Sequence, residues 1–362
     1  MGFLRIFLAF SVVNIHGKLL NVALMPADAA VEAFYIISGF YMAMVLNEKY
    51  NRQGVTYGDF ILSRFFRLAP AYYLVVILTL IVLFVAWLGF GAVLAPLSHW
   101  QGIDGKVSPT IFLYLVVPQI SIVGLDITNF FTLNPIAGLS FTPTFLSEPM
   151  QLWRLLFVPQ AWSLALELYF YIMAPLILRR PIWVLVVLIV LSFFVRAFLA
   201  LDYDFRFDPW SYRFFPSELL YFLSGSLAYR LSRDEPSTSA KKLILMLCFI
   251  LILLAGYIAH FGLDGREFFL GPIALGLLFV FIPKIFEISK NISIDRYVGE
   301  LSYPLYISHM LVIWVTALIF VQGSVQQRVA IFVGAVLLSA GIFELVDKRV
   351  DRWRHRVFAN KT

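Results

Sequence analysis

Residues 68–90 read LAPAYYLVVILTLIVLFVAWLGF and contain no charged side chain. About 20 consecutive apolar residues let a helix cross the hydrocarbon core of a bilayer, so this stretch is long enough to span a membrane. The rest of the 362-residue chain has the same character, with 61% hydrophobic and only 14% charged residues. Soluble domains carry about 25% charged residues, which excludes a soluble globular protein. The composition therefore predicts an all-α polytopic membrane protein.

Further apolar stretches lie on both sides of this one, which gives about ten transmembrane helices in all. Their ranges are 4–22, 29–47, 161–178, 182–201, 214–231, 242–260, 268–284, 302–321 and 327–346. With the N-terminus in the cytoplasm, most of the 28 Lys and Arg residues fall on the cytoplasmic side. Cytoplasmic loops carry such an excess, so both termini are predicted to be cytoplasmic. We expect an integral-membrane domain over residues 1–346 and a basic cytoplasmic tail over 347–362.

Residues 91–160 separate the third and fourth predicted spans. Within them the stretch 110–125 is apolar, but Pro109, Pro118 and Gly124 interrupt it. A crossing at this point would invert every later loop and place the Lys and Arg residues of those loops outside, against the usual distribution. We therefore expect one long external loop, part of which lies on or enters the membrane.

Charge and cysteine content exclude several classes of partner. The net charge is +6, but no basic domain is present that would bind nucleic acid. The only cysteine is Cys248, which excludes a disulfide scaffold and a cysteine-ligated metal site. Neither a metal nor a permanently bound cofactor is expected.

Ionisable residues within the predicted spans are the strongest indication of function. Such residues are costly at membrane depth and usually face protein or a water-filled cavity. Any one of them could be a helix-packing residue, but several together indicate a site. They are Arg5, His16, Glu32, Glu167, Arg196, Glu218 and His309.

Arg5 and His16 are predicted to share one face of the first helix. They are 11 residues apart, and steps of about 100° place the second side chain only about 20° past three full turns, some 16.5 Å farther along the helix. Glu32 enters the second span from outside at a depth that differs from that of His16 by about 4–5 Å. If the two spans are neighbours, a His16–Glu32 pair is feasible, in which the carboxylate would orient the imidazole.

The chemistry of these residue types suggests a long phosphorylated substrate. Histidine is suited to proton transfer near neutral pH and can also accept an acyl group. Arginine at the cytoplasmic end is suited to phosphate, through its planar fork of donors. Acyl-coenzyme A has both features, since its phosphates are joined by an extended arm to a thioester.

The chain also resembles a known family, membrane acyltransferase family 3. The pair Arg5 and His16 resembles the signature of the family's first helix. FYIISGF at 34–40 resembles its Phe-Phe-x-x-Ser-Gly-Phe stretch, with Glu32 where an acidic residue commonly precedes it. RFFRLAPAYY at 64–73 resembles its cytoplasmic Arg-x-x-Arg-x-x-Pro-x-Tyr segment.

Two later stretches continue the resemblance in the same order. WSLALELYFY at 162–171 resembles a Trp-Ser-Leu-x-x-Glu-x-x-Phe-Tyr pattern, and SYPLYISH at 302–309 resembles a Ser-Tyr-x-Leu-Tyr-x-x-His stretch. The chain departs from the family at Ser63, where a further arginine is common, and at Leu166, where a second acid is common. It resembles the stand-alone members, which lack a C-terminal hydrolase-like domain.

The resemblance implies roles for individual residues. His16 would be the catalytic histidine, Glu32 or Glu167 would orient it, and the coenzyme phosphates would bind to Arg5, Arg64 and Arg67. Other residues with a possible supporting role are Ser38, Tyr303 and His309. For these three the alternatives are helix packing next to Gly39, an interfacial aromatic position, and packing in the inner half of the membrane.

We therefore expect an integral-membrane O-acyltransferase of the bacterial inner membrane. Its co-substrate would be a cytoplasmic acyl-CoA, with acetyl-CoA expected, and its acceptor a hydroxyl of an envelope or exported carbohydrate or of a lipid-linked saccharide. The alternative is a multi-pass transporter or lipid flippase, for which buried His, Glu and Arg are equally natural.

Overall fold

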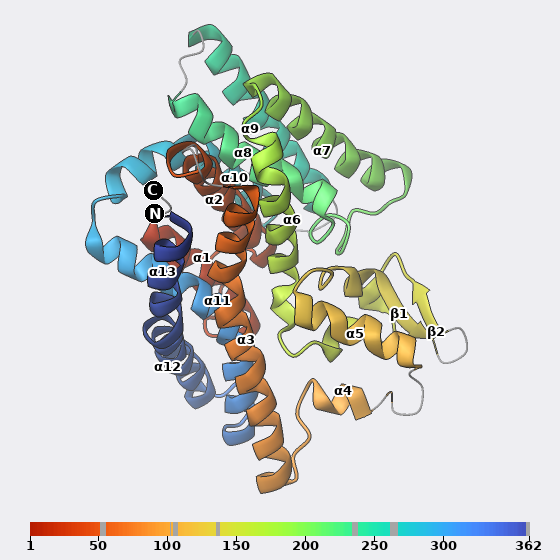
Figure 1. Cartoon of the computed structure of the whole chain (residues 1–362). Helices are drawn as coiled ribbons and strands as arrows, with labels where there is room; N and C mark the ends of the chain where they lie inside the picture. The colour runs from red at the N-terminus through yellow and green to blue at the C-terminus, as the bar shows by residue number, and fades with distance from the viewer. Residues whose placement is uncertain are drawn as a thin grey trace.

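The computed structural model describes residues 1–50, 56–101, 103, 108–134, 138–233, 238–260 and 267–359. Each predicted span contains a helix (Figure 1). These helices are α1 (Gly2–Gly17), α2 (Ala27–Glu48), α3 (Tyr57–Phe90), α6 (Trp162–Ile177), α7 (Ile182–Asp202), α8 (Phe215–Arg233), α9 (Thr238–His260), α10 (Glu267–Ser289), α11 (Ser293–Ile319) and α12 (Val325–Ile342). Within the described ranges, seven helices are long and apolar enough to cross a membrane. The protein is an all-α polytopic membrane protein.

Helices α3 and α11 begin well before their predicted spans, and both differences bear on the site. Helix α3 begins at Tyr57 because Thr56 caps it, accepting from the backbone N–H of Asp59 at 3.2 Å while Asp59 accepts from Thr56. Arg64 and Arg67 therefore lie on a helix and not in a loop. Helix α11 begins at Ser293, nine positions before the apolar run that starts at residue 302. Hydropathy marks where a helix meets the hydrocarbon, whereas the backbone helix extends into more polar surroundings.

Residues 91–160 form a lobe beside α6, seen in yellow in Figure 1. Its elements are α4 (Leu97–Gln101), α5 (Pro109–Ser121), the antiparallel strands β1 (Phe131–Asn134) and β2 (Gly138–Phe141), and short 3₁₀ turns at Ile127–Phe130, Phe145–Ser147, Leu152–Leu155 and Pro159–Ala161. The lobe has a small apolar core of its own. Helix α5 has 13 residues, too few for a crossing of about 20. An eleventh crossing, which the sequence analysis rejected, is thus absent from the described part of this region.

Glycines allow two pairs of helices to approach closely. Helices α2 and α8 meet at Gly39, where an added Cβ would lie 1.8 Å from the backbone oxygen of Phe222. Helices α1 and α11 meet at Gly2, where an added Cβ would lie 1.5 Å from the backbone oxygen of Asp295. Since Gly2 lies at the start of α11 and His16 lies at His309, α1 and α11 run parallel. This arrangement turns one face of α1 toward α11 along its whole length.

The segment predicted as a cytoplasmic tail packs against α3. After α12 the chain continues through a π-helical turn (Phe343–Asp347), helix α13 (Lys348–Arg354) and a second π-helical turn (His355–Ala359). Phe66 of α3 contacts Trp353, with ring centres 5.1 Å apart. The last three residues of the predicted tail lie outside the described ranges. The N-terminus and α13 lie on the same face of the protein (Figure 1), which the distribution of Lys and Arg predicts to be cytoplasmic.

Candidate active site

A cavity of about 570 Å³ extends into the helices from the face that carries the N-terminus and α13. It lies between α1, α2, α3, α6, α10 and α11, with Arg354 at the end of α13 at its mouth. The cavity brings together most of the residues predicted from sequence to form the site. They are Arg5, Ser38, Arg64, Arg67, Glu167 and Tyr303. A single cavity therefore joins residues that lie up to about 300 positions apart in the chain.

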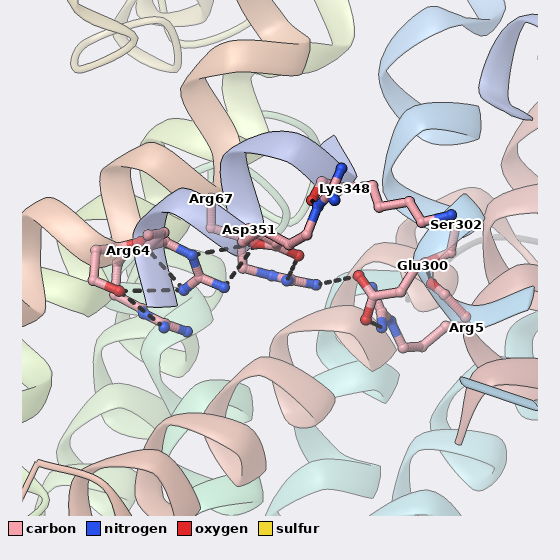
Figure 2. Close-up of polar contacts among 11 residues, drawn as sticks. Arg5, Arg64, Arg67, Glu300, Ser302, Lys348 and Asp351 are labelled. Carbon is pink, nitrogen blue, oxygen red and sulfur yellow. Dashed lines mark hydrogen bonds and ion pairs between the residues drawn. The ribbon is translucent and has the colours of Figure 1, made fainter. Parts of the chain in front are cut away.

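The mouth of the cavity is strongly basic (Figure 2). Arg67 pairs with Glu300 at 2.9 Å and with Asp351 at 3.4 Å, and Arg5 lies 3.8 Å from the other oxygen of Glu300. Asp295 fixes the start of α1, since its carboxylate accepts from the backbone N–H groups of Gly2 and Phe3 at 2.7 and 2.8 Å. A carboxylate at a helix N-terminus is favourable because the free N–H groups there carry partial positive charge. This cap places Arg5 one turn inside the helix.

Lys49 follows directly after α2 and adds a further charge to the lining of the cavity. Burial lowers the pKa of Lys49 below its ordinary value, and the neighbouring guanidinium groups of Arg64 and Arg354 lower that pKa further. Each positive group at the mouth thus makes the next one costlier in the absence of an anion. Such an arrangement is suited to bind negative charge.

A polar cluster lies in the middle of the cavity. Glu167 accepts a hydrogen bond from Ser38 at 2.9 Å and another from the hydroxyl of Tyr171. Tyr303 also lines the cavity, and its hydroxyl donates to the backbone oxygen of Leu68 at 2.6 Å. Ser38 is therefore directed into the cavity while its neighbour Gly39 forms the close contact with α8. The packing and the polar contact are carried by adjacent residues, and neither excludes the other.

Two hydroxyl groups, those of Ser163 and Tyr306, line the end of the cavity that is farthest from the basic mouth. The Ser163 and Tyr306 oxygens are 2.7 Å apart, and both groups also contact the backbone oxygen of Gln160. The ring of Tyr306 lies 6.1 Å, centre to centre, from the ring of His309. Tyr306 thus borders the cavity on one side and the predicted catalytic region on the other.

His16 and His309 form a pair beyond Tyr306. The Nδ1 atom of His16 lies 2.9 Å from the Nε2 atom of His309. The ring planes are within 4° of parallel and the ring centres are 5.1 Å apart, which is the geometry of two rings joined edge to edge by one hydrogen bond. His309 is fully buried, whereas His16 is exposed. His309 lies at the depth of His16, so its predicted place in the inner half is wrong.

The contacts of His309 determine which nitrogen carries each proton. Its Nδ1 atom is 2.6 Å from the backbone oxygen of Tyr306, and a carbonyl oxygen can only accept. In the neutral pair, Nδ1 of His309 therefore carries a proton and Nε2 accepts. His16 must then donate from Nδ1, which leaves the lone pair of His16 on Nε2. This is the arrangement in which one side chain fixes the tautomer of a base.

The predicted His16–Glu32 pair is wrong. Glu32 is 1% exposed and pairs with Arg196 of α7 at 3.2 Å. The same guanidinium pairs with Glu218 of α8 at 2.5 Å. Glu167 does not contact His16 either; its recorded partners, Ser38 and Tyr171, lie in the cavity. The direction in which Glu32 points depends on which helices pack against α2, and its depth along the helix does not determine that direction.

Several residues of the site were missed by the sequence analysis. Glu300, two positions before the SYPLYISH stretch, receives Arg5 and Arg67. Tyr171 follows Glu167 by four positions, and this spacing on one helix face could have indicated the contact. Tyr306 stands within the SYPLYISH stretch itself. Arg354 carried no signal in the sequence, since it belongs to a segment interpreted as a tail.

The comparisons with known proteins identify the family of the chain. A family model described as an acyltransferase domain, that of acyltransferase family 3, matches residues 1–344. The chain belongs to acyltransferase family 3. A relative from Aquifex aeolicus (strain VF5), named only as an uncharacterized protein, is 24% identical over 208 residues, which cover 55% of this chain and 90% of that protein. No solved structure matches this family member. The protein is a multi-pass integral membrane acyltransferase.

Proposed function

We propose that this acyltransferase moves an acyl group, with acetyl as the first candidate, from a cytoplasmic acyl-CoA to a hydroxyl of an exported or envelope carbohydrate, free or lipid-linked. The observation that carries the proposal is the polarity of the cavity. One end is lined by arginines, and the other end lies at Tyr306, next to the His16–His309 pair. The proposed location is the inner membrane of a bacterium, where the basic mouth would face the cytoplasm.

The donor would lie along α1. Arg5, Arg64 and Arg67 would bind the coenzyme phosphates through charge-assisted hydrogen bonds. The extended arm would pass Ser38 and Glu167, so that the thioester lies near Ser163 and Tyr306. Arg5 and His16 are separated by about 16.5 Å of helix rise. A carrier whose phosphates and thioester are far apart fits this separation.

His16 would act through its Nε2 atom. This nitrogen takes the proton of the acceptor hydroxyl, whose oxygen attacks the thioester carbon. The new carbon–oxygen bond forms as the carbon–sulfur bond breaks, and the leaving thiolate takes the proton from His16. His309 would hold the required tautomer throughout. The hydroxyls of Ser163 and Tyr306 would turn from the backbone oxygen of Gln160 to donate to the developing oxyanion. A two-step route through an acyl group on Nε2 would use the same nitrogen.

A single assay tests the proposal. The purified protein, reconstituted in vesicles with a lipid and saccharide extract of its own membranes, is supplied with acetyl-CoA labelled in the acetyl group. The expected result is release of free coenzyme A together with appearance of the label in the extract. A transporter or flippase would move its substrate across the vesicle membrane without releasing a thiol. Absence of both thiol release and label transfer, in protein that still binds acetyl-CoA, would contradict the proposal.

A further inference from the structure

The C-terminal helix α13 places one arginine inside the mouth of the cavity. Arg354 is 4% exposed and lines the cavity, although its neighbours Arg352 and Trp353 are exposed. Its Nη1 atom lies 3.2 Å from the hydroxyl of Ser63 on α3. A charged side chain is seldom buried without a partner that holds it there. The position of Arg354 therefore needs an explanation.

Arg64 reaches the same hydroxyl from its own helix. Its Nη2 atom lies 3.3 Å from the hydroxyl of Ser63, and its side chain is 7% exposed. Two guanidinium groups thus converge on one neutral oxygen. The Nε atom of Arg64 is buried and has no hydrogen-bond partner, and within the described ranges no carboxylate forms an ion pair with Arg64. Buried donors are nearly always satisfied, so this donor indicates a missing acceptor.

Arg354 is held in place independently of any ligand. Asp351 accepts from Nη2 of Arg354 at 2.7 Å and from its Nε at 3.2 Å, one turn earlier on α13. The ring of Phe66 on α3 lies 5.1 Å, centre to centre, from the ring of Trp353 and 6.4 Å from that of Phe358, which fastens the C-terminal segment to α3. The guanidinium is therefore fixed before a ligand arrives. A donor held in this way costs little entropy when it binds.

We propose that Arg354, Arg64 and Ser63 form a phosphate-binding subsite, and that α13 is a part of the donor site. The two guanidinium groups offer several N–H donors toward one point, and a phosphoryl group carries up to two negative charges and three acceptor oxygens. A phosphate there satisfies Nε of Arg64 and relieves the repulsion between the two arginines. The ligand assignment rests on the proposed function: the phosphate belongs to coenzyme A, in its 3′-phosphate or its pyrophosphate.

The test uses a matched pair of variants on the same helix. Arg354→Gln removes the charge at the subsite, whereas Arg352→Gln removes an equal charge from the exposed face of α13. The described polar contact of the Arg352 side chain is to the backbone oxygen of Lys348. Binding of coenzyme A and of inorganic pyrophosphate to the reconstituted full-length protein is measured by calorimetry. Arg354→Gln is expected to weaken both by roughly 10- to 100-fold, and Arg352→Gln by less than about two-fold.

A third probe identifies the phosphate. Dephospho-coenzyme A lacks the 3′-phosphate, so the effect of Arg354→Gln disappears with this probe if the subsite holds the 3′-phosphate. The effect persists if the subsite holds the pyrophosphate. If Arg354→Gln lowers the thermal stability of the protein, Arg354→Lys and Arg352→Lys replace the pair. Lysine keeps the charge but loses the planar fork, so Arg354→Lys should still weaken binding several-fold.

The outcomes separate the subsite from the proposed function. If coenzyme A binds the wild-type protein and the variants at Arg354 and Arg352 bind it equally well, the subsite is wrong and the donor assignment is unaffected. If the wild-type protein binds pyrophosphate in a manner that depends on Arg354 but does not bind coenzyme A, the subsite stands and the proposed donor is wrong. If neither probe binds the wild-type protein, both are wrong.

Discussion

Two groups of buried arginines in this protein differ in how their positive charge is compensated. Arg196 of α7 is 2% exposed, and its terminal nitrogens contact Glu32, Glu218, the hydroxyl of Tyr221 and two backbone oxygens. Arg64 and Arg354 are similarly buried, but they converge on the hydroxyl of Ser63. The first group lies outside the lining of the cavity and the second lies within it.

This difference shows when an ionisable residue at membrane depth indicates a site. Arg196 joins α2, α7 and α8 through carboxylates that the chain itself supplies, so its cluster needs no ligand. Arg64 has no such carboxylate among the described residues, and Arg354 shares its carboxylate, Asp351, with Arg67. A ligand can supply the missing negative charge. Residue type and burial are the same in both groups. What distinguishes them is the source of the counter-charge and access to a cavity.

The largest effect is expected at His16, the proposed catalytic base next to the cavity. His16→Ala should reduce acyl transfer by at least 10²–10⁴-fold, because a general base or nucleophile commonly contributes that much. Coenzyme A affinity should stay within a few-fold, since the phosphates bind at the other end of the cavity. Label transfer from acetyl-CoA and calorimetric binding of coenzyme A measure the two quantities. A folded His16→Ala protein that transfers the label at the wild-type rate would refute the catalytic role.

The second effect is expected at Arg196 and concerns stability instead of activity. Arg196→Met leaves two carboxylates buried without their cation, and breaking a buried pair in this way costs about 3–5 kcal/mol. The free energy of unfolding, from denaturant titration of the purified protein, should fall by about that amount. Adding Glu32→Gln and Glu218→Gln should recover part of it. An Arg196→Met protein of normal stability that fails to transfer acyl groups would remove the distinction between the two groups.

The sequence predicts the helices well because hydropathy and charge are properties of single segments. The positions of the helices and the shared face of Arg5 and His16 follow from local pattern and helix geometry. Both side chains indeed reach α11, at Glu300 and at His309. The starts of α3 and α11 were wrong because a cap and a polar cavity extend a helix beyond its apolar part.

Partners across helices could not be predicted in the same way. Glu32 pairs with Arg196 because α2 packs against α7 and α8, and no local pattern encodes that neighbourhood. The contribution of α13 was hidden because a basic segment after the last apolar run is typical of a solvated tail. Ser63, where the chain departs from the family pattern, is the residue that Arg354 contacts. A guanidinium at this point is thus supplied by the far end of the chain.

A smaller effect is expected at His309, which contacts His16 and not the substrate. His309→Ala removes the acceptor that fixes the His16 tautomer and should lower kcat about 10- to 100-fold, as loss of an orienting partner commonly does. His309→Gln offers a side-chain oxygen to the N–H of His16 and should recover part of the loss. KM for acetyl-CoA should stay nearly constant in both variants. Equal loss in the two variants would indicate that His309 only packs.

The smallest effect is expected at Lys49, a titratable residue in the lining of the cavity. Burial and then the charges of Arg64 and Arg354 lower the pKa of Lys49 in the free protein, and a bound phosphate would raise that pKa again. Binding is therefore strongest below the pKa of the free state and weakens as the pH rises through the pKa of the bound state. Above about pH 8 the phosphates of acetyl-CoA are fully ionised, so a loss of affinity that the wild-type protein shows and the Lys49→Gln variant does not would come from Lys49. Lys49→Gln should bind acetyl-CoA a few-fold more weakly at pH 8 and lose the dependence on pH.

Cavity tyrosines such as Tyr41 are present in both proteins, so the difference between the two pH curves isolates Lys49. If both proteins lose affinity equally as the pH rises, Lys49 is a surface charge outside the electrostatic group formed by Arg64 and Arg354.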